Sequence, residues 1–147
     1  MKASSKLYPI FAFGIGFFSF LVGSGIYMCI RTTNLEMFKI FPNGLPYWLY
    51  CLRSLFSTFD IPNFVKYSLP DGLWLFSYLM IIDGIWFGYK SPIHLLYLAV
   101  LPIVAFLSEI LQMFKLFPGT GDLVDILFYF MSILIFITIK YYKLWQN

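Results

Sequence analysis

Four polar residues interrupt an apolar stretch in the second half of the chain, LSEILQMFKLFPGTGDLVDILF. They are Glu109, Gln112, Asp122 and Asp125. A carboxylate at the centre of a membrane-spanning helix costs about 2.5–3.5 kcal/mol, so such a group faces a partner, water or the interior of a helix bundle. Converging carboxylate and amide oxygens have the chemistry to bind a cation or a polar headgroup. The same residue types also serve as helix caps and as clamps between helices.

The position of Glu109 leaves two interpretations open. It precedes the predicted end of its helix by about seven residues, or roughly 10 Å. We expect Arg31 or Lys115 as its charge partner, and we expect Gln112, one turn later on the same face, to orient it by hydrogen bonding. These contacts suit an interhelical clamp and a functional pocket equally well.

The aspartates have the spacing of helix-start residues. Ser68-Leu-Pro70-Asp71 predicts an N-cap followed by a proline and an acid in the first turn. Asp122 and Asp125 have the same three-residue spacing at the start of the last helix. An acid in the first turn satisfies free N–H groups and suits the helix dipole. Each aspartate alone is therefore predicted to be a cap, whereas together with Glu109 they suggest a shared polar pocket.

The sequence has no Ser–His–Asp arrangement, no HExxH motif and no phosphate-binding loop. We therefore assign no catalytic residue, expect neither a metal site nor a cofactor, and favour a protein that is not an enzyme. Asp83 lies in a different place, MIIDGIW, and we expect it to pair with Lys90 and His94, or with Lys140. His94, the only histidine, is predicted to be an interfacial residue. Cys29 and Cys51 are predicted to be two free thiols, with a disulfide as the alternative.

Composition places these residues in a membrane protein. The chain of 147 residues is 61% hydrophobic, 22% aromatic and only 12% charged, whereas soluble domains are about a quarter charged. The net charge is +3 without a basic run, which argues against nucleic-acid binding. The N-terminus begins like a signal peptide, but its apolar run is too long for one and predicts a retained transmembrane helix.

The elements that must position the polar residues form an all-α, polytopic bundle in a single domain, 1–147. Four segments have the length and apolar character of spans, about 8–30, 70–88, 92–116 and 122–142. Glycines at 14, 16, 23 and 25 offer small surfaces for close helix packing in the first span. An amphipathic helix at about 45–58 is predicted either in the membrane interface or against the end of the bundle. The tight connection 118–121 makes the last two spans an antiparallel hairpin.

This topology brings the polar residues to one membrane face, which we call the loop face because the long first connection lies there. The five residues predicted on it are Asp71, Glu109, Gln112, Asp122 and Asp125. Basic residues are shared equally between the two faces, namely Lys2, Lys6, Lys90, Lys140 and Lys143 on the terminal face and Arg31, Lys39, Arg53, Lys66 and Lys115 on the loop face. The terminal face carries no acid, so we expect both termini in the cytoplasm.

The pattern Ser108-Glu109-Ile-Leu-Gln112, followed by Pro118-Gly119-Thr120-Gly121-Asp122 and Asp125, resembles the VanZ-like family of small bacterial membrane proteins. Pro70-Asp71 with Ser77-Tyr78 is a weaker likeness to the family's earlier aspartate helix start. The loop 117–121 lacks the arginine that family members often carry, which makes the chain a divergent member. The resemblance implies a multi-pass protein of the bacterial inner membrane, connected with the cell envelope and with resistance to glycopeptide antibiotics such as teicoplanin.

The sequence thus favours a membrane protein with a polar pocket of Asp71, Glu109, Gln112, Asp122 and Asp125. The expected partners are the bilayer and a lipid headgroup, an envelope precursor or a cation in that pocket. The alternative is a non-catalytic subunit that assembles with other membrane proteins and uses the same acids as caps and clamps.

Overall fold

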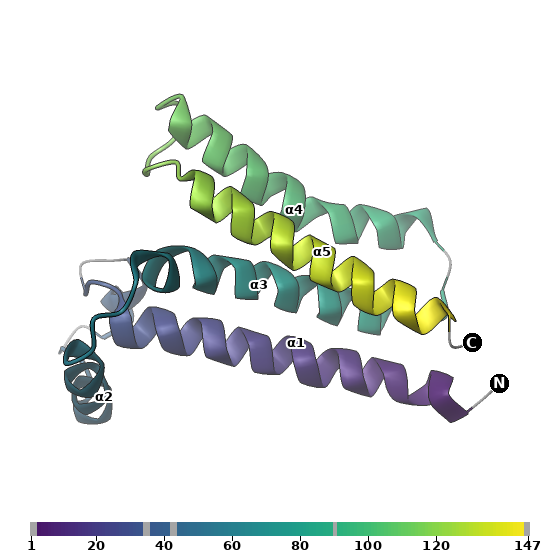
Figure 1. The fold of residues 1–147 in the computed structure, drawn as a ribbon, viewed down its shortest axis with the longest axis horizontal. Coiled ribbons are helices and arrows are strands. Elements are labelled where there is room, and N and C mark those ends of the chain that lie inside the picture. Colours follow the sequence, from purple (N-terminus) through teal and green to yellow (C-terminus); the bar gives the residue numbers. More distant parts are fainter. Residues whose placement is uncertain (1–2, 34–35, 42–43, 90, 146–147) are drawn as a thin grey trace.

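The computed structural model describes residues 3–33, 36–41, 44–89 and 91–145, and this part of the chain is helical without strands. The elements in chain order are α1 (Ala3–Ile30), the 3₁₀ helix η1 (Glu36–Ile40), α2 (Tyr47–Ser57), α3 (Asn63–Ile85), α4 (Pro92–Met113) and α5 (Leu123–Trp145). The four long helices lie side by side, with α3 in contact with α1, α4 and α5 (Figure 1). The start of α1 and the end of α5 lie at one end of this bundle, and α2 lies at the other.

Three helices of the described part are long and apolar enough to cross a membrane, over Leu7–Ile30, Pro92–Met113 and Leu123–Tyr142. The predicted all-helical architecture is therefore confirmed, and the three apolar helices agree with the predicted membrane protein. The second predicted span, 70–88, falls on α3, whose interior contains buried Ser68, Ser77 and Asp83. These polar side chains face neighbouring helices, so α3 combines a more polar composition with the most central position in the bundle.

Small residues set the close contact between α1 and α3. A Cβ atom on Gly16 would lie 2.8 Å from the Ile81 side chain, and one on Gly23 would lie 3.1 Å from Trp74. Nothing lies within 4 Å of a Cβ atom built on Gly14 or Gly25. Of the four glycines predicted to permit close packing, the two that face α3 do so, as expected for small residues at a helix interface.

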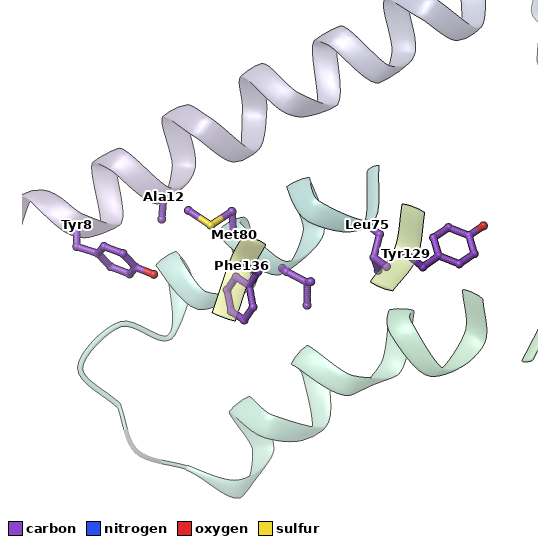
Figure 2. Close-up of a cluster of buried hydrophobic side chains, with 7 residues drawn as sticks. Tyr8, Ala12, Leu75, Met80, Tyr129 and Phe136 are labelled. Carbon is purple, nitrogen blue, oxygen red and sulfur yellow. The ribbon is translucent and has the colours of Figure 1, made fainter. Parts of the chain in front are cut away.

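The main buried cluster joins α1, α3 and α5. It contains Tyr8, Ala12, Leu75, Leu79, Met80, Tyr129 and Phe136 (Figure 2). Leu75 and Leu79 project from α3, and Tyr129 and Phe136 from α5, which places α3 between its two main partners. Most large apolar side chains of α4 and α5 outside this cluster are exposed, which suits helices that face lipid.

The predicted start of the second span is wrong. The helix begins at Asn63 after Pro62, so Ser68 and Pro70 are buried within α3 and Asp71 lies in its third turn. The proline ring removes one backbone donor, which normally ends or kinks a helix. Here the Arg31 guanidinium donates to the Tyr67 carbonyl in the same turn, at 3.2 Å. The helix nevertheless continues through Pro70, which removes the donor to the Lys66 carbonyl.

The predicted end of the third span, 116, lies three residues beyond the end of α4 at Met113. The last turn closes in a Schellman motif, because Leu116 donates to the Leu111 carbonyl and Lys115 to the Gln112 carbonyl. Lys115 has a φ of 57° in this motif, the left-handed conformation that reverses the chain. Glu109 therefore lies one turn from the end of α4 instead of two.

The other predicted helix borders agree better with the structure. The Ser91 side chain accepts a hydrogen bond from the Ile93 N–H with Pro92 in the first turn of α4, as predicted. The amphipathic helix predicted at about 45–58 is α2, which buries Leu49 and packs against the end of α1. Cys29 and Cys51 are free thiols.

Candidate functional site

Arg31 and Asp71 form the entrance to a polar region at the end of the bundle nearest α2. The Arg31 Nη2 atom lies 3.9 Å from the Asp71 Oδ2 atom. The guanidinium is held over the rings of Tyr27 and Tyr67, at 5.1 and 4.8 Å from their centroids. Cation–π contacts of this kind fix an arginine without neutralising it. Arg31, predicted as a charge partner of Glu109, is instead the partner of Asp71.

Glu109 is buried, with 6% of its surface exposed. Its Oε2 atom accepts a hydrogen bond from the Asp122 backbone N–H at 3.0 Å, so it joins the end of α4 to the start of α5. The contact is tight because a Cβ atom on Gly121 would lie 2.8 Å from the Glu109 carbonyl oxygen. Only glycine at that position lets the connecting backbone approach so closely. The clamp predicted for Glu109 is therefore present.

Gln112 was predicted to orient Glu109 by hydrogen bonding, but another group does so. Gln112 packs against the connecting loop, where a Cβ atom on Gly119 would lie 2.6 Å from its amide, and the donor to Glu109 is the backbone of Asp122. Lys115 is exposed, and in the described part of the chain it forms no ion pair.

Asp122 and Asp125 differ in the hydrogen-bond partners of their carboxylate oxygens. Asp122 caps α5, because its Oδ1 atom accepts a hydrogen bond from the Val124 N–H at 2.9 Å. Asp125 lies in the first turn of α5, as predicted. Its Oδ1 atom is buried and has no hydrogen-bond partner within the described residues. A buried acceptor without a partner costs about 1–3 kcal/mol, and the Arg31 Nε atom is likewise buried without a hydrogen-bond partner within the described residues.

Asp71, Glu109 and Asp125 share one electrostatic environment between α3, α4 and α5, and we call these three residues the acidic cluster. Asp71 interacts electrostatically with both other carboxyl groups, and Glu109 interacts with Asp125. The buried Tyr129 ring lies near all three. The structure therefore brings together residues from three helices, and Arg31 pairs with one of them, Asp71. Within the described residues no group of three or more His, Cys, Asp or Glu side chains has metal-binding geometry.

A second polar cluster lies at the opposite end of the bundle, around Asp83. This carboxylate is 4% exposed and accepts a hydrogen bond from the Tyr8 hydroxyl at 2.6 Å. Lys140 Nζ lies 2.5 Å and His94 Nε2 3.3 Å from its Oδ1 atom. Asp83 thus joins α1, α3, α4 and α5, and we call these four residues the Asp83 hub.

Asp83 was predicted to pair either with Lys90 and His94 or with Lys140; His94 and Lys140 both lie beside it, and the contact with Tyr8 was not predicted. Lys2 and Lys90, and the side chains of Lys6 and Lys143, lie outside the described part of the chain. The signal for Tyr8 was its position at the start of the first span, which the topology places on the same face as Asp83. His94 stacks on Trp86 at 6.0 Å between ring centroids, so it is part of the bundle as well as of its surface.

Comparisons with known proteins identified no relative. No family model, no curated protein and no solved structure matches the chain. The site must therefore be interpreted from its own residues.

Proposed function

We propose that the chain is a four-span membrane protein that binds a positively charged headgroup, of a lipid or an envelope precursor, in the acidic cluster. The observation that carries the proposal is the buried Asp125 Oδ1 atom, which lacks a partner beside two further carboxyl groups. Three carboxyl groups interact there and one guanidinium, that of Arg31, pairs with Asp71, so the site is suited to a further cation. A primary ammonium group supplies both positive charge and N–H donors.

The charge and geometry of the site favour an ammonium group over a metal ion. The carboxyl groups come from three different helices, and one of the Glu109 oxygens is already used by the Asp122 N–H. An ammonium group needs fewer and less regular ligands than a divalent cation, which takes six or more oxygens. Arg31, at the entrance, is placed to pair with the phosphate that accompanies an ammonium in a zwitterionic headgroup.

The proposal includes the membrane arrangement. In it, α3 is the fourth span, α2 lies in the interface and both termini are cytoplasmic in the bacterial inner membrane. The exposed aromatic residues of α2, including Trp48 and Tyr50, support an interfacial position. The resemblance of the Glu109–Asp125 pattern to the VanZ-like family supports a role in the cell envelope, including tolerance of glycopeptide antibiotics. A role in the envelope would require a ligand found there, such as an amine-bearing lipid or precursor.

The experiment is to purify the full-length protein in mild detergent and identify the lipids it retains by native mass spectrometry. We expect an amine-bearing lipid on the wild type and its loss from the Glu109→Gln/Asp125→Asn double variant. Asp60→Asn is the matched control, because Asp60 is an exposed acid outside the cluster. Equal retention by the wild type and a folded double variant would refute the proposal.

The second candidate is a subunit that assembles with other membrane proteins. It is favoured by the structural contacts of Glu109 and Asp122, which clamp the hairpin and cap α5. The same purification separates the two candidates. A stable complex with another membrane protein supports the subunit, whereas a monomer that retains lipid supports the binding pocket.

A further inference from the structure

A cavity of about 490 Å³ lies where the end of α1, α2 and the start of α3 meet, and its lining includes no residue of the acidic cluster. Among the described residues that line it, the charged ones are Arg53 and Lys66, and none is acidic. The hydroxyl groups of Thr33, Ser54 and Ser57 also line it. Guanidinium, ammonium and hydroxyl donors are the groups that bind phosphate oxygens in proteins. The cavity therefore has the opposite charge preference to the acidic cluster.

The backbone at the end of α1 fixes the position of Arg53. Its Nη1 atom donates to the Met28 carbonyl and its Nη2 atom to the Arg31 carbonyl, each at 2.5 Å. Both carbonyls lie at the end of the helix, where no intrahelical donor remains. The guanidinium also lies 5.4 Å from the centroid of the Phe38 ring. These bonds use two of the five N–H donors of Arg53 and leave three for another acceptor.

The cavity lies beside the end of the apolar span of α1. That span ends at Ile30, which is itself a lining residue, and the end of a membrane span is where phospholipid phosphates are expected. Tyr47, Trp48 and Tyr50 are exposed on the adjacent α2, and exposed aromatic residues are typical of the membrane interface. The rest of the lining is largely apolar and includes Phe59 and Ile61, which suits the glycerol end of an acyl chain.

We infer that this cavity binds the phosphate of an anionic membrane phospholipid between Arg53 and Lys66. The free guanidinium donors hold the phosphate oxygens, the Lys66 ammonium adds a second positive charge and the Thr33 and Ser54 hydroxyl groups complete the shell. Since none of the described lining residues is a carboxylate, none of them favours a lipid that carries an ammonium group. Charge complementarity therefore selects an anionic lipid over a zwitterionic one.

The test compares lipids and variants of the full-length protein in a neutral detergent. Thermal unfolding is followed by tryptophan fluorescence during titration with phosphatidylglycerol, phosphatidylcholine or inorganic phosphate at matched ionic strength. We expect phosphatidylglycerol alone to raise the Tm of the wild type. In Lys66→Glu its apparent affinity should fall by at least about tenfold, the effect of losing one charge-assisted contact. Lys115→Gln, an exposed loop-face lysine outside the cavity, should behave as the wild type.

Two results would overturn the inference. One is equal stabilisation by phosphatidylglycerol and phosphatidylcholine, and the other is equal stabilisation by inorganic phosphate, which would indicate a site for free anions. If Lys66→Glu fails to fold, Lys66→Gln and Ser54→Trp decide the matter, because the tryptophan fills the cavity and leaves both cations in place. Unchanged phosphatidylglycerol binding in both of these variants would also overturn it.

Discussion

Replacing Lys140 with methionine tests whether the Asp83 hub holds the end of the bundle together. The substitution keeps an unbranched side chain but removes the charge that lies 2.5 Å from a carboxylate that is 4% exposed. Removing one partner of a fully buried ion pair costs about 3–5 kcal/mol. Lys140 is 34% exposed and Asp83 keeps its bond from the Tyr8 hydroxyl, so we expect a smaller loss of about 2 kcal/mol in the free energy of unfolding.

The assay is reversible unfolding in mixed micelles, with Asp83→Asn and the Asp83→Asn/Lys140→Met double variant measured in parallel. The double variant should be more stable than Lys140→Met alone, because it contains no buried carboxylate that has lost its lysine. Lys115→Met is the control and should leave stability unchanged, since Lys115 is exposed outside the hub. If the free energy of unfolding of Lys140→Met is within about 0.5 kcal/mol of the wild-type value, as for an ordinary surface substitution, the reasoning is refuted.

Three further predictions follow from contacts within the bundle and use the same unfolding assay. Gly16→Val should destabilise the protein by about 1–3 kcal/mol, because its Cβ atom would lie 2.8 Å from Ile81. Gly14→Val is the control, since nothing lies within 4 Å of a Cβ atom at that position. Equal destabilisation by the two substitutions would contradict the α1–α3 interface. Glu109→Ala should cost about 1–3 kcal/mol, because it leaves the Asp122 N–H without its acceptor, whereas Glu109→Gln keeps an acceptor and should cost less. Asp122→Ala should cost about 1 kcal/mol by removing the cap of α5, and Asp122→Asn should retain most of the stability.

The helices and the face on which the polar residues lie could be predicted from length, apolar character and turn residues. Glu109 was expected to be buried near the loop face and is, because a carboxylate in an apolar helix must face protein or water. Its hydrogen-bond donor could not be predicted, since the Asp122 N–H reaches it only through the close approach of the Gly121 backbone. The i, i+3 spacing along one helix predicted Gln112 as the donor to Glu109, but the donor is a backbone N–H at the start of the next helix.

The position of Asp71 could not be predicted from the residues next to it in the sequence. Serine, proline and aspartate in this order usually mark the first turn, yet α3 begins seven residues before Pro70, at Asn63. The guanidinium of Arg31, distant in sequence, bonds the Tyr67 carbonyl and pairs with Asp71 within the continuing helix. The Tyr8–Asp83 bond likewise joins residues 75 positions apart, so it depends on how α1 packs against α3.

The binding of an amine-bearing lipid to the acidic cluster can be measured most directly with phosphatidylethanolamine and the Asp125→Asn variant. Equilibrium titration in neutral detergent compares this lipid with phosphatidylcholine, whose quaternary ammonium has no N–H donor. We predict that the wild type prefers phosphatidylethanolamine and that Asp125→Asn weakens its binding by about tenfold, the effect of losing one charge-assisted hydrogen bond. Equal affinity of the wild type and Asp125→Asn for phosphatidylethanolamine would contradict the proposed function.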